Sequence, residues 1–329
     1  MISKTLKSFL FFVRKLLGVN LILNKLEAME FGLSTILTPD SLPLGVKLEI
    51  LPGSVYAKVA IPLDYRPSRS YEPRWGYSKE KINSLNDWLQ NYEGEYSKFV
   101  SRMFEQDVSS ISVDYNPEES SKHAFVGGAI CAFDSLSIYT MLLVHKPRIY
   151  CEIGSGMTTL FAKQSIIDNA LKTRIISIDP EPRQFVDNVC DEIIREPLES
   201  LDPAWFDQLN AGDILFMDGS HRSFMNSDVT VFFIDILPRI KPGVVIHIHD
   251  INLPYDYPDS FKEWYWNEQY LLAVYLMASM EKVIPLLPTT FICRSEKLKA
   301  LISENFVSLG SAERDESWFG GGSFWFTKK

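Results

Sequence analysis

The second half of the chain alternates between short apolar segments and amphipathic ones, starting near residue 148. Apolar runs of this length predict buried strands, and strands that alternate with amphipathic helices predict a doubly wound, mostly parallel sheet. The strongest strand candidates are 148–153, 174–178, 213–217 and 244–249. The pattern, together with 46% hydrophobic and 23% charged residues, excludes a disordered chain, a collagen and a coiled-coil rod. We therefore expect an α/β protein.

Weaker patterns complete the expected order of elements. A short strand is predicted around 193–194, and two more are predicted near the end, at 283–287 and 323–327. Helical periodicity of the apolar residues predicts the connecting helices. These are 158–170, 182–193, 227–237 and 260–280, with earlier helices within 79–106 and at 133–144.

The 329 residues divide into three predicted parts. Residues 1–40 form a basic amphipathic helix and its exit, residues 41–145 form an extension that covers part of the cleft, and residues 146–329 form the sheet domain. Residues 1–25 carry five basic side chains and no acid, and Arg14-Lys15 interrupts the apolar core that a signal peptide would need. Such a helix either lies on the inner, anionic membrane surface or packs on the protein or on a second subunit of a homo-oligomer.

Net charge and cysteine content restrict the kinds of binding partner and the cellular compartment that we expect. The formal net charge is −9, whereas nucleic-acid binding usually needs a basic surface, so we expect no nucleic-acid partner. The four cysteines are dispersed and form no C-x-x-C pair, which argues against a zinc ribbon and a disulfide framework. No apolar run approaches the ~20 residues of a membrane span. These features indicate a cytoplasmic protein with reduced thiols.

Polar residues follow the first two strong strands, at the edge where a parallel sheet binds its ligands. The first turn contains Glu152, Gly154, Ser155, Gly156 and Thr158. Its glycines allow a tight turn and a close approach of the backbone to a ligand, and Thr158 is expected to cap the next helix. Asp179 ends the second strand, where a carboxylate can accept both hydroxyls of a ribose. The pattern predicts a nucleoside-containing cofactor.

The residue at the third glycine position of the motif indicates which of two classes of nucleoside cofactor the turn suits. Dinucleotide-binding folds prefer G-x-G-x-x-G, because the third glycine lets the helix pack closely on the strand. This chain has Thr159 there. The motif therefore favours S-adenosylmethionine over a dinucleotide, and a dehydrogenase is an alternative that the missing glycine disfavours.

Two later strand ends carry acids and histidines. Asp218 and His221 follow the third strong strand, and His249 and Asp250 end the fourth. Alternation along the fourth strand turns His247 and His249 to one side and Asp250 to the other. His247 lies deeper in the strand, where we expect a buried, hydrogen-bonded imidazole. His249 serves either as a ligand or as support for the loop.

Four segments carry a resemblance to a known family. They are YCEIGSGMTT at 150–159, IDPEP at 178–182, GDILFMDGSH at 212–221 and PGVVIHIHDI at 242–251. They resemble the motifs of class I S-adenosylmethionine-dependent methyltransferases, which have a Rossmann-like fold. Two further segments, LPYDYP and NEQYLL, are similar to a bacterial branch related to cephalosporin hydroxylase and the macrolide sugar O-methyltransferases.

The resemblance implies roles for the motif residues. The implied cofactor-binding residues are Glu152, Gly154, Ser155, Gly156, Thr158, Asp179 and Asp218. The segment around Pro197 would run alongside the adenine ring of the cofactor. In metal-dependent relatives, acids at the ends of two strands bind magnesium. This chain offers Asp218 and Asp250 but has His249 where relatives often carry a second acid, so a softer divalent ion suits this set better than magnesium.

The implied reaction is methylation of a small-molecule or glycan hydroxyl with S-adenosylmethionine. Such a hydroxyl hardly ionises at neutral pH, so a general base or a metal must take up the developing charge. His221 is the first candidate for the base, because histidine titrates near neutrality, and Asp250 is the second. The alternatives are a hydroxylase-like member of the same branch that does not methylate, and a binding protein without turnover.

An aromatic segment follows the fourth strong strand. It includes Tyr257, Phe261, Trp264, Tyr265 and Trp266. It forms either a lid that stacks on a sugar or aromatic acceptor, or part of the core under the long helix; core packing is the favoured interpretation for Phe261, Tyr265 and Trp266. Glu268 is expected either to reach the site or to cap the helix.

Overall fold

The computed structural model describes residues 48–50, 57–59, 73–76, 80–114, 124–126, 130–182, 186–261, 264–308 and 320–329. The chain separates into two compact units, Met1–Tyr71 and Glu72–Lys329. In the first unit, the described strands β1 (Leu48–Ile50) and β2 (Ala57–Val59) pair antiparallel. The helix predicted for residues 1–40 lies outside the described residues. Among the described helices, none has the length and apolar character needed to cross a membrane.

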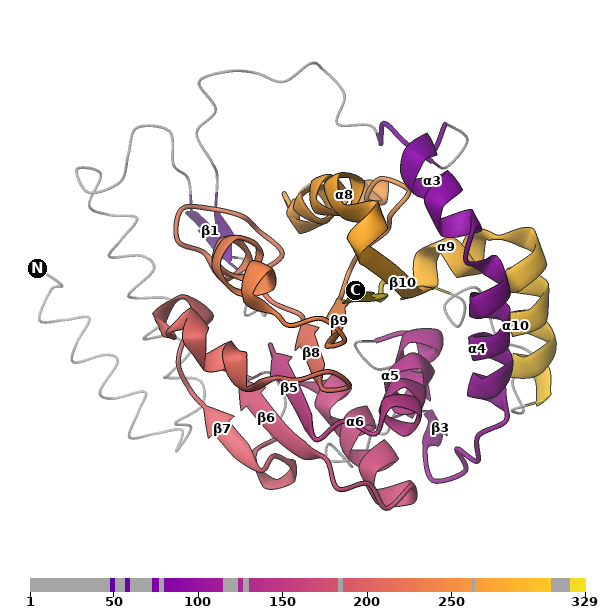
Figure 1. The fold of residues 1–329 in the computed structure, drawn as a ribbon, viewed down its shortest axis with the longest axis horizontal. Coiled ribbons are helices and arrows are strands. Elements are labelled where there is room, and N and C mark those ends of the chain that lie inside the picture. Colours follow the sequence, from indigo (N-terminus) through magenta and orange to yellow (C-terminus); the bar gives the residue numbers. More distant parts are fainter. Residues whose placement is uncertain are drawn as a thin grey trace, which may run out of the picture. The chain divides into compact units, whose positions relative to one another are not determined.

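A seven-stranded sheet forms the centre of the second unit, in the order β10-β11-β9-β8-β5-β6-β7 (Figure 1). Its strands are β5 (Ile149–Ile153), β6 (Arg174–Ile178), β7 (Glu192–Ile194), β8 (Ile214–Met217), β9 (Val245–Ile248), β10 (Val283–Pro288) and β11 (Phe324–Lys328). The strands from β9 to β7 are parallel, whereas β11 is antiparallel to both of its neighbours, β9 and β10. The predicted α/β, Rossmann-like fold with a mostly parallel sheet is confirmed.

The register of the parallel strands brings their carboxyl ends to one edge. Ile153 at the end of β5 lies opposite Ile178 of β6 and Met217 of β8, and Met217 lies opposite Ile248 of β9. The residues that follow these four positions therefore leave the sheet side by side. This edge collects the polar strand ends that the sequence pattern singled out.

Helices connect the strands and cover the sheet. They are α3 (Asn83–Gln90), α4 (Glu93–Phe104), α5 (Ala132–His145), α6 (Met157–Asp168), α7 (Asp228–Val231), α8 (Glu268–Ser279), α9 (Thr289–Arg294) and α10 (Glu296–Ser308). Helices α5 and α6 pack on each other beside β5, and α4, α9 and α10 gather near β10 (Figure 1). A short parallel pair, β3 (Ser112–Asp114) and β4 (Ala124–Val126), precedes α5.

Two predicted helices were wrong in extent. The helix predicted at 260–280 begins only at Glu268, since Asp259–Phe261 is a single 3-10 turn and residues 264–267 are not helical. The helix predicted at 182–193 is replaced, among the residues described there, by a single 3-10 turn, Asp187–Val189. Asp191 already pairs with β6, since its backbone N–H donates to Ile175 and its carboxylate accepts from the Ile175 N–H. That pairing leaves no room for a helix up to residue 193.

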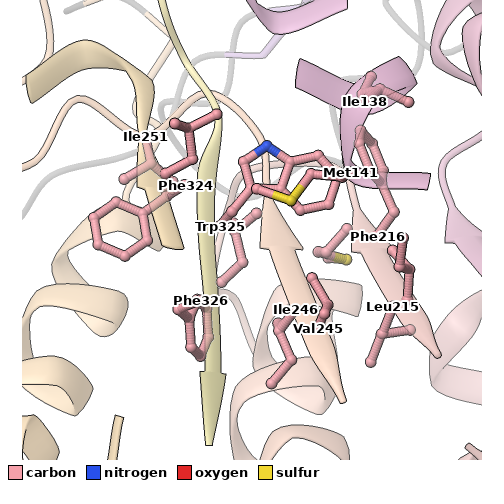
Figure 2. Close-up of a cluster of buried hydrophobic side chains, with 14 of the residues drawn as sticks. Ile138, Met141, Leu215, Phe216, Val245, Ile246, Ile251, Phe324, Trp325 and Phe326 are labelled. Atoms are coloured by element: carbon pink, nitrogen blue, oxygen red, sulfur yellow. The ribbon is translucent and has the colours of Figure 1, made fainter. Parts of the chain in front are cut away.

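Part of the hydrophobic core fills the space between the sheet and α5. Phe216 on β8 and Trp325 on β11 lie on the same side of the sheet as Ile138 and Met141 of α5 (Figure 2). The Trp325 indole N–H donates to the Ser137 hydroxyl at 3.1 Å, which satisfies its only polar group. Central strands of a parallel sheet are covered on both faces, which explains why they read as nearly continuous apolar runs in the sequence.

Candidate active site

The turn after β5 is held by its first glycine and by a buried glutamate. Gly154 has a φ of +79°, and a Cβ at this position would lie 1.8 Å from the carbonyl oxygen of Asp218, so only glycine fits. Glu152 is fully buried and accepts hydrogen bonds from the hydroxyls of Thr158 and Thr159. Burial raises the pKa of Glu152 to about 8, although both hydroxyls act to lower it. Glu152 thus anchors the first turn of α6 to β5.

Thr158 does not cap α6, in contrast to the prediction. The helix begins at Met157, so the capping position falls on Gly156. The Gly156 N–H is satisfied by the Thr159 hydroxyl at 3.0 Å. Thr158 lies inside the first turn of α6, and its hydroxyl donates to Glu152, which fixes this turn to β5.

Asp179 lies at the end of β6 beside the glycine turn. One carboxylate oxygen accepts the Ser155 N–H at 2.8 Å, and the other accepts the Glu181 N–H at 2.8 Å. Each carboxylate oxygen has a second lone pair that can accept another hydrogen bond. A carboxylate that binds the two hydroxyls of a ribose needs these acceptors. Arg195, which the sequence analysis did not single out, donates to the Asp179 carbonyl at 3.1 Å and pairs with Asp187.

His221 lies at the centre of a carboxylate cluster. Its Nε2 is 3.4 Å from Asp218 Oδ1 and 3.4 Å from Asp250 Oδ2, and its Nδ1 is 2.5 Å from Glu268 Oε1. Only 8% of His221 is exposed, and only 1% of Glu268. Burial alone lowers the pKa of His221, but Glu268, Asp218 and Asp250 outweigh it and raise the pKa to about 9. The structure thus joins three strand-end residues with the first turn of α8.

Backbone geometry at this cluster is strained. His221 has a φ of +60° and Asp250 a φ of +56°, a left-handed conformation that non-glycine residues seldom adopt. Such outliers persist only where the surrounding structure enforces them, and they gather at functional sites. At His221 the backbone is fixed by a hydrogen bond, because its carbonyl accepts the Asn267 N–H at 2.9 Å.

His249 and His247 occupy the other side of Asp250. The Nδ1 of His249 is 3.4 Å from Asp250 Oδ1, and its Nε2 is 3.8 Å from Asp134 Oδ2 on α5. Burial lowers the pKa of His249, but Asp250, Asp218 and Asp134 raise it to about 10. His247 is buried as expected, but the expected hydrogen bond is absent among the described residues: its ring stacks on Phe216 at 3.8 Å.

One group of donors in the described part of the chain could hold a metal ion. One ligand atom each from Asp218, His221 and Asp250 lies within 4.8 Å of the others. The sequence-based set combined Asp218 and Asp250 with His249 instead. The structure keeps the two acids together with His221 between them, and His249 contacts Asp250 through Nδ1 and Asp134 through Nε2.

Asp134 was missed by the sequence analysis. It is buried in the first turn of α5 and accepts the Gly322 N–H at 2.7 Å and the Thr289 hydroxyl at 2.7 Å. It thereby links α5, α9 and the segment before β11 behind His249. An acid in the first turn of a helix is ordinarily explained by its favourable interaction with the helix dipole. The local sequence therefore gives no indication that Asp134 connects three segments behind His249.

Comparisons with known proteins gave one family match and several similar solved structures. Residues 151–251 match a family model described as a methyltransferase domain. Similar solved structures include SAH-bound methyltransferase PaMTH1 of Podospora anserina, with 14% identity, a TM-score of 0.37 and coverage of 78% of this chain and 100% of that chain. They also include the plantazolicin methyltransferase BpumL in complex with SAH, with 13% identity, a TM-score of 0.36 and coverage of 75% and 99%. A search of curated proteins found no match.

Proposed function

We propose that this class I S-adenosylmethionine-dependent methyltransferase transfers the sulfonium methyl group to a hydroxyl oxygen of a small molecule or glycan. The class expected from the sequence motifs agrees with the family model over residues 151–251 and with the mostly parallel sheet. The acceptor and the role of each residue below are our proposal.

The arrangement of His221 carries the proposal. The methyl group of a sulfonium is already electrophilic, so the demanding task is to remove the proton of a weakly acidic hydroxyl. His221 has an imidazole nitrogen at the sheet edge, and its other nitrogen contacts the buried Glu268. A carboxylate behind an imidazole fixes the tautomer and stabilises the positive charge that follows proton uptake. His221 therefore takes the proton, and Glu268 positions it.

On the cofactor side, Asp179 holds the ribose while the turn from Gly154 to Gly156 lines the methionine part. Asp179→Ala is expected to weaken binding of S-adenosylmethionine about 10- to 100-fold, because hydrogen bonds to a charged group contribute about 1.5–3 kcal/mol. Isothermal titration calorimetry measures this. Asp207→Ala, which removes only an exposed ion pair with Arg239, is the control.

The same titration tests the cofactor class. The unaltered protein is expected to bind S-adenosylmethionine and not NAD, because Thr159 replaces the third glycine of the dinucleotide motif. Binding of NAD alone would contradict the proposal, and so would equal cofactor affinity of the Asp179→Ala variant and the unaltered protein.

A divalent metal fits the acceptor side of the site. Asp218, Asp250 and His221 would hold it, and a bound metal would then replace His221 in stabilising negative charge on the acceptor oxygen, because an imidazole nitrogen that ligates a metal cannot also accept a proton. The mixed oxygen and nitrogen donors suit a softer ion than magnesium. Methyl transfer that is lost in chelator and restored by manganese or zinc, while cofactor binding persists, would support this role. Methyl transfer unchanged in chelator would exclude it.

The pH profile tests the pairing of Glu268 with His221. A base must be unprotonated to act, so kcat/KM is expected to rise with pH through the His221 pKa of about 9. Glu268→Gln removes the carboxylate that contributes most to the raised pKa, so the rise should move to lower pH by about one unit or more. Glu196→Gln, a glutamate on a different strand end, is the control and should leave the profile in place. An unshifted profile in Glu268→Gln would show that His221 is not the titrating group.

A further inference from the structure

A closed set of hydrogen bonds adjoins the glycine turn, where the neighbouring strands β6 and β7 end (Figure 1). We define the polar network as Ser155, Ser177, Asp179 and Arg195. Arg195 donates through Nη1 to the Ser177 hydroxyl at 3.2 Å and to the Asp179 carbonyl at 3.1 Å. The Ser177 and Ser155 hydroxyls lie 2.7 Å apart, and the Ser155 N–H donates to the Asp179 carboxylate at 2.8 Å. Each member therefore contacts the next, and the last contacts the first.

Arg195 is fixed within this network by its neighbours. It directly follows β7, and its Nη2 pairs with Asp187 in the connection between the two strands. The Asp179 N–H donates to the Ile194 carbonyl at 3.1 Å, so the backbones of the two strand ends are also bonded. A guanidinium has five N–H donors and no acceptor. Arg195 can therefore only donate to the other members of the polar network.

This constraint decides which serine donates to the other. Ser177 is fully buried, and a hydroxyl has one proton and two lone pairs. If Ser155 donated to Ser177, both lone pairs of Ser177 would be used, and its own proton would have no acceptor in the described part of the chain. An unpaired buried donor is costly, so Ser177 donates to Ser155 instead.

The Ser155 hydroxyl then keeps its own proton for a ligand at the glycine turn. The adjacent Asp179 carboxylate offers acceptors there, so this edge presents one hydroxyl donor beside two carboxylate oxygens. S-adenosylmethionine matches both. Its ribose hydroxyls can donate to a carboxylate, and its own carboxylate and ribose oxygens can accept from a hydroxyl.

We infer that Arg195 and Ser177 are positioning residues for the cofactor: they direct the Ser155 hydroxyl proton to an oxygen of S-adenosylmethionine and hold Asp179 beside it. This inference rests on the cofactor of the proposed function and not on its acceptor.

Titration calorimetry with S-adenosylmethionine tests the two hydroxyls. Ser155→Ala is expected to weaken binding about tenfold and Ser177→Ala about fivefold, the range of one neutral hydrogen bond. The double variant should bind no more weakly than Ser155→Ala, because Ser177 acts only through Ser155. Thermal melting establishes that each variant is folded. Unchanged affinity in Ser177→Ala, or losses that multiply in the double variant, would overturn the inference.

A second pair of variants tests the guanidinium. Arg195→Ala is expected to weaken binding of S-adenosylmethionine about tenfold, whereas Arg195→Lys should recover only part of the loss, because an ammonium lacks the fork that reaches several acceptors. Arg174→Gln is the matched control. It removes the 2.9 Å ion pair with Glu192, which joins the other ends of the same two strands, and should leave the affinity unchanged.

The outcomes separate the two levels of the argument. Equal losses in Arg195→Ala and Arg174→Gln would show that Arg195 only holds the strands together, and this would overturn the inference. Equal affinity of Arg195→Ala and the unaltered protein would do so too, with the proposed function intact. Unaltered protein that binds no S-adenosylmethionine would instead overturn the proposed function, and this inference with it.

Discussion

Replacement of His221 by alanine is expected to lower kcat for methyl transfer by about 10²- to 10⁴-fold, the usual contribution of a positioned general base. Cofactor affinity should stay within about threefold of the unaltered protein, because Gly154 and Asp179 hold the cofactor on neighbouring strand ends. Initial rates with labelled S-adenosylmethionine and titration calorimetry measure the two quantities. Their combination separates loss of a base from loss of the binding site.

The control is His145→Ala, which removes a histidine at the far end of α5 and should leave kcat unchanged. Loss of His221 also leaves Glu268 as a buried carboxylate without its imidazole, so thermal melting must establish that the variant is folded. Folded His221→Ala protein with full turnover would eliminate His221 as the base and leave Asp250 as the remaining candidate.

Gly154→Ala is expected to reduce the free energy of unfolding by about 3 kcal/mol or more. The left-handed backbone there costs a non-glycine residue about 1–2 kcal/mol, and the added Cβ would clash with the Asp218 carbonyl at 1.8 Å. The adjacent ends of β5 and β8 would have to separate. Urea unfolding of the two proteins measures the difference.

Gly156→Ala is the matched control two residues away. Its φ of −174° is extended, and no atom of the structure lies within 4 Å of an added Cβ. We expect its free energy of unfolding to change by less than about 1 kcal/mol, while its methyl group fills space proposed for the cofactor and weakens binding. Equal destabilisation by both substitutions would contradict the distinct roles assigned to the two glycines.

The central strands of the sheet were predictable because they are buried on both faces and therefore stand out as apolar runs. Parallel register then requires that residues after β5, β6, β8 and β9 meet at one edge. The positions of Asp179, Asp218 and Asp250 follow from that geometry alone. Local sequence patterns give the wrong secondary structure where pairing with a distant segment determines it. At Asp191, hydrogen bonds to Ile175 of β6 exclude the predicted helix.

The side chains that contact His221 and His249 inside the site could not be predicted from the sequence. Glu268 lies far along the chain from His221, and the sequence allowed a simple helix-capping role for it. Only the fold brings the start of α8 against the loop after β8. Asp134 is likewise recognisable only from the contacts that α9 and the segment before β11 make with α5. Core packing was the favoured interpretation for Phe261, Tyr265 and Trp266, whereas Tyr265 remains 44% exposed.

The antiparallel strand β11 has a consequence for how the chain is made. It lies between β9 and β10 and bonds to both, yet a ribosome synthesises it after both of them. During translation, β9 and β10 therefore emerge with open edges and apolar faces, and Phe324, Trp325 and Phe326 join them only later. Open edges of this kind are templates for misassembly. This edge of the sheet is therefore expected to close only after Phe324, Trp325 and Phe326 have left the ribosome.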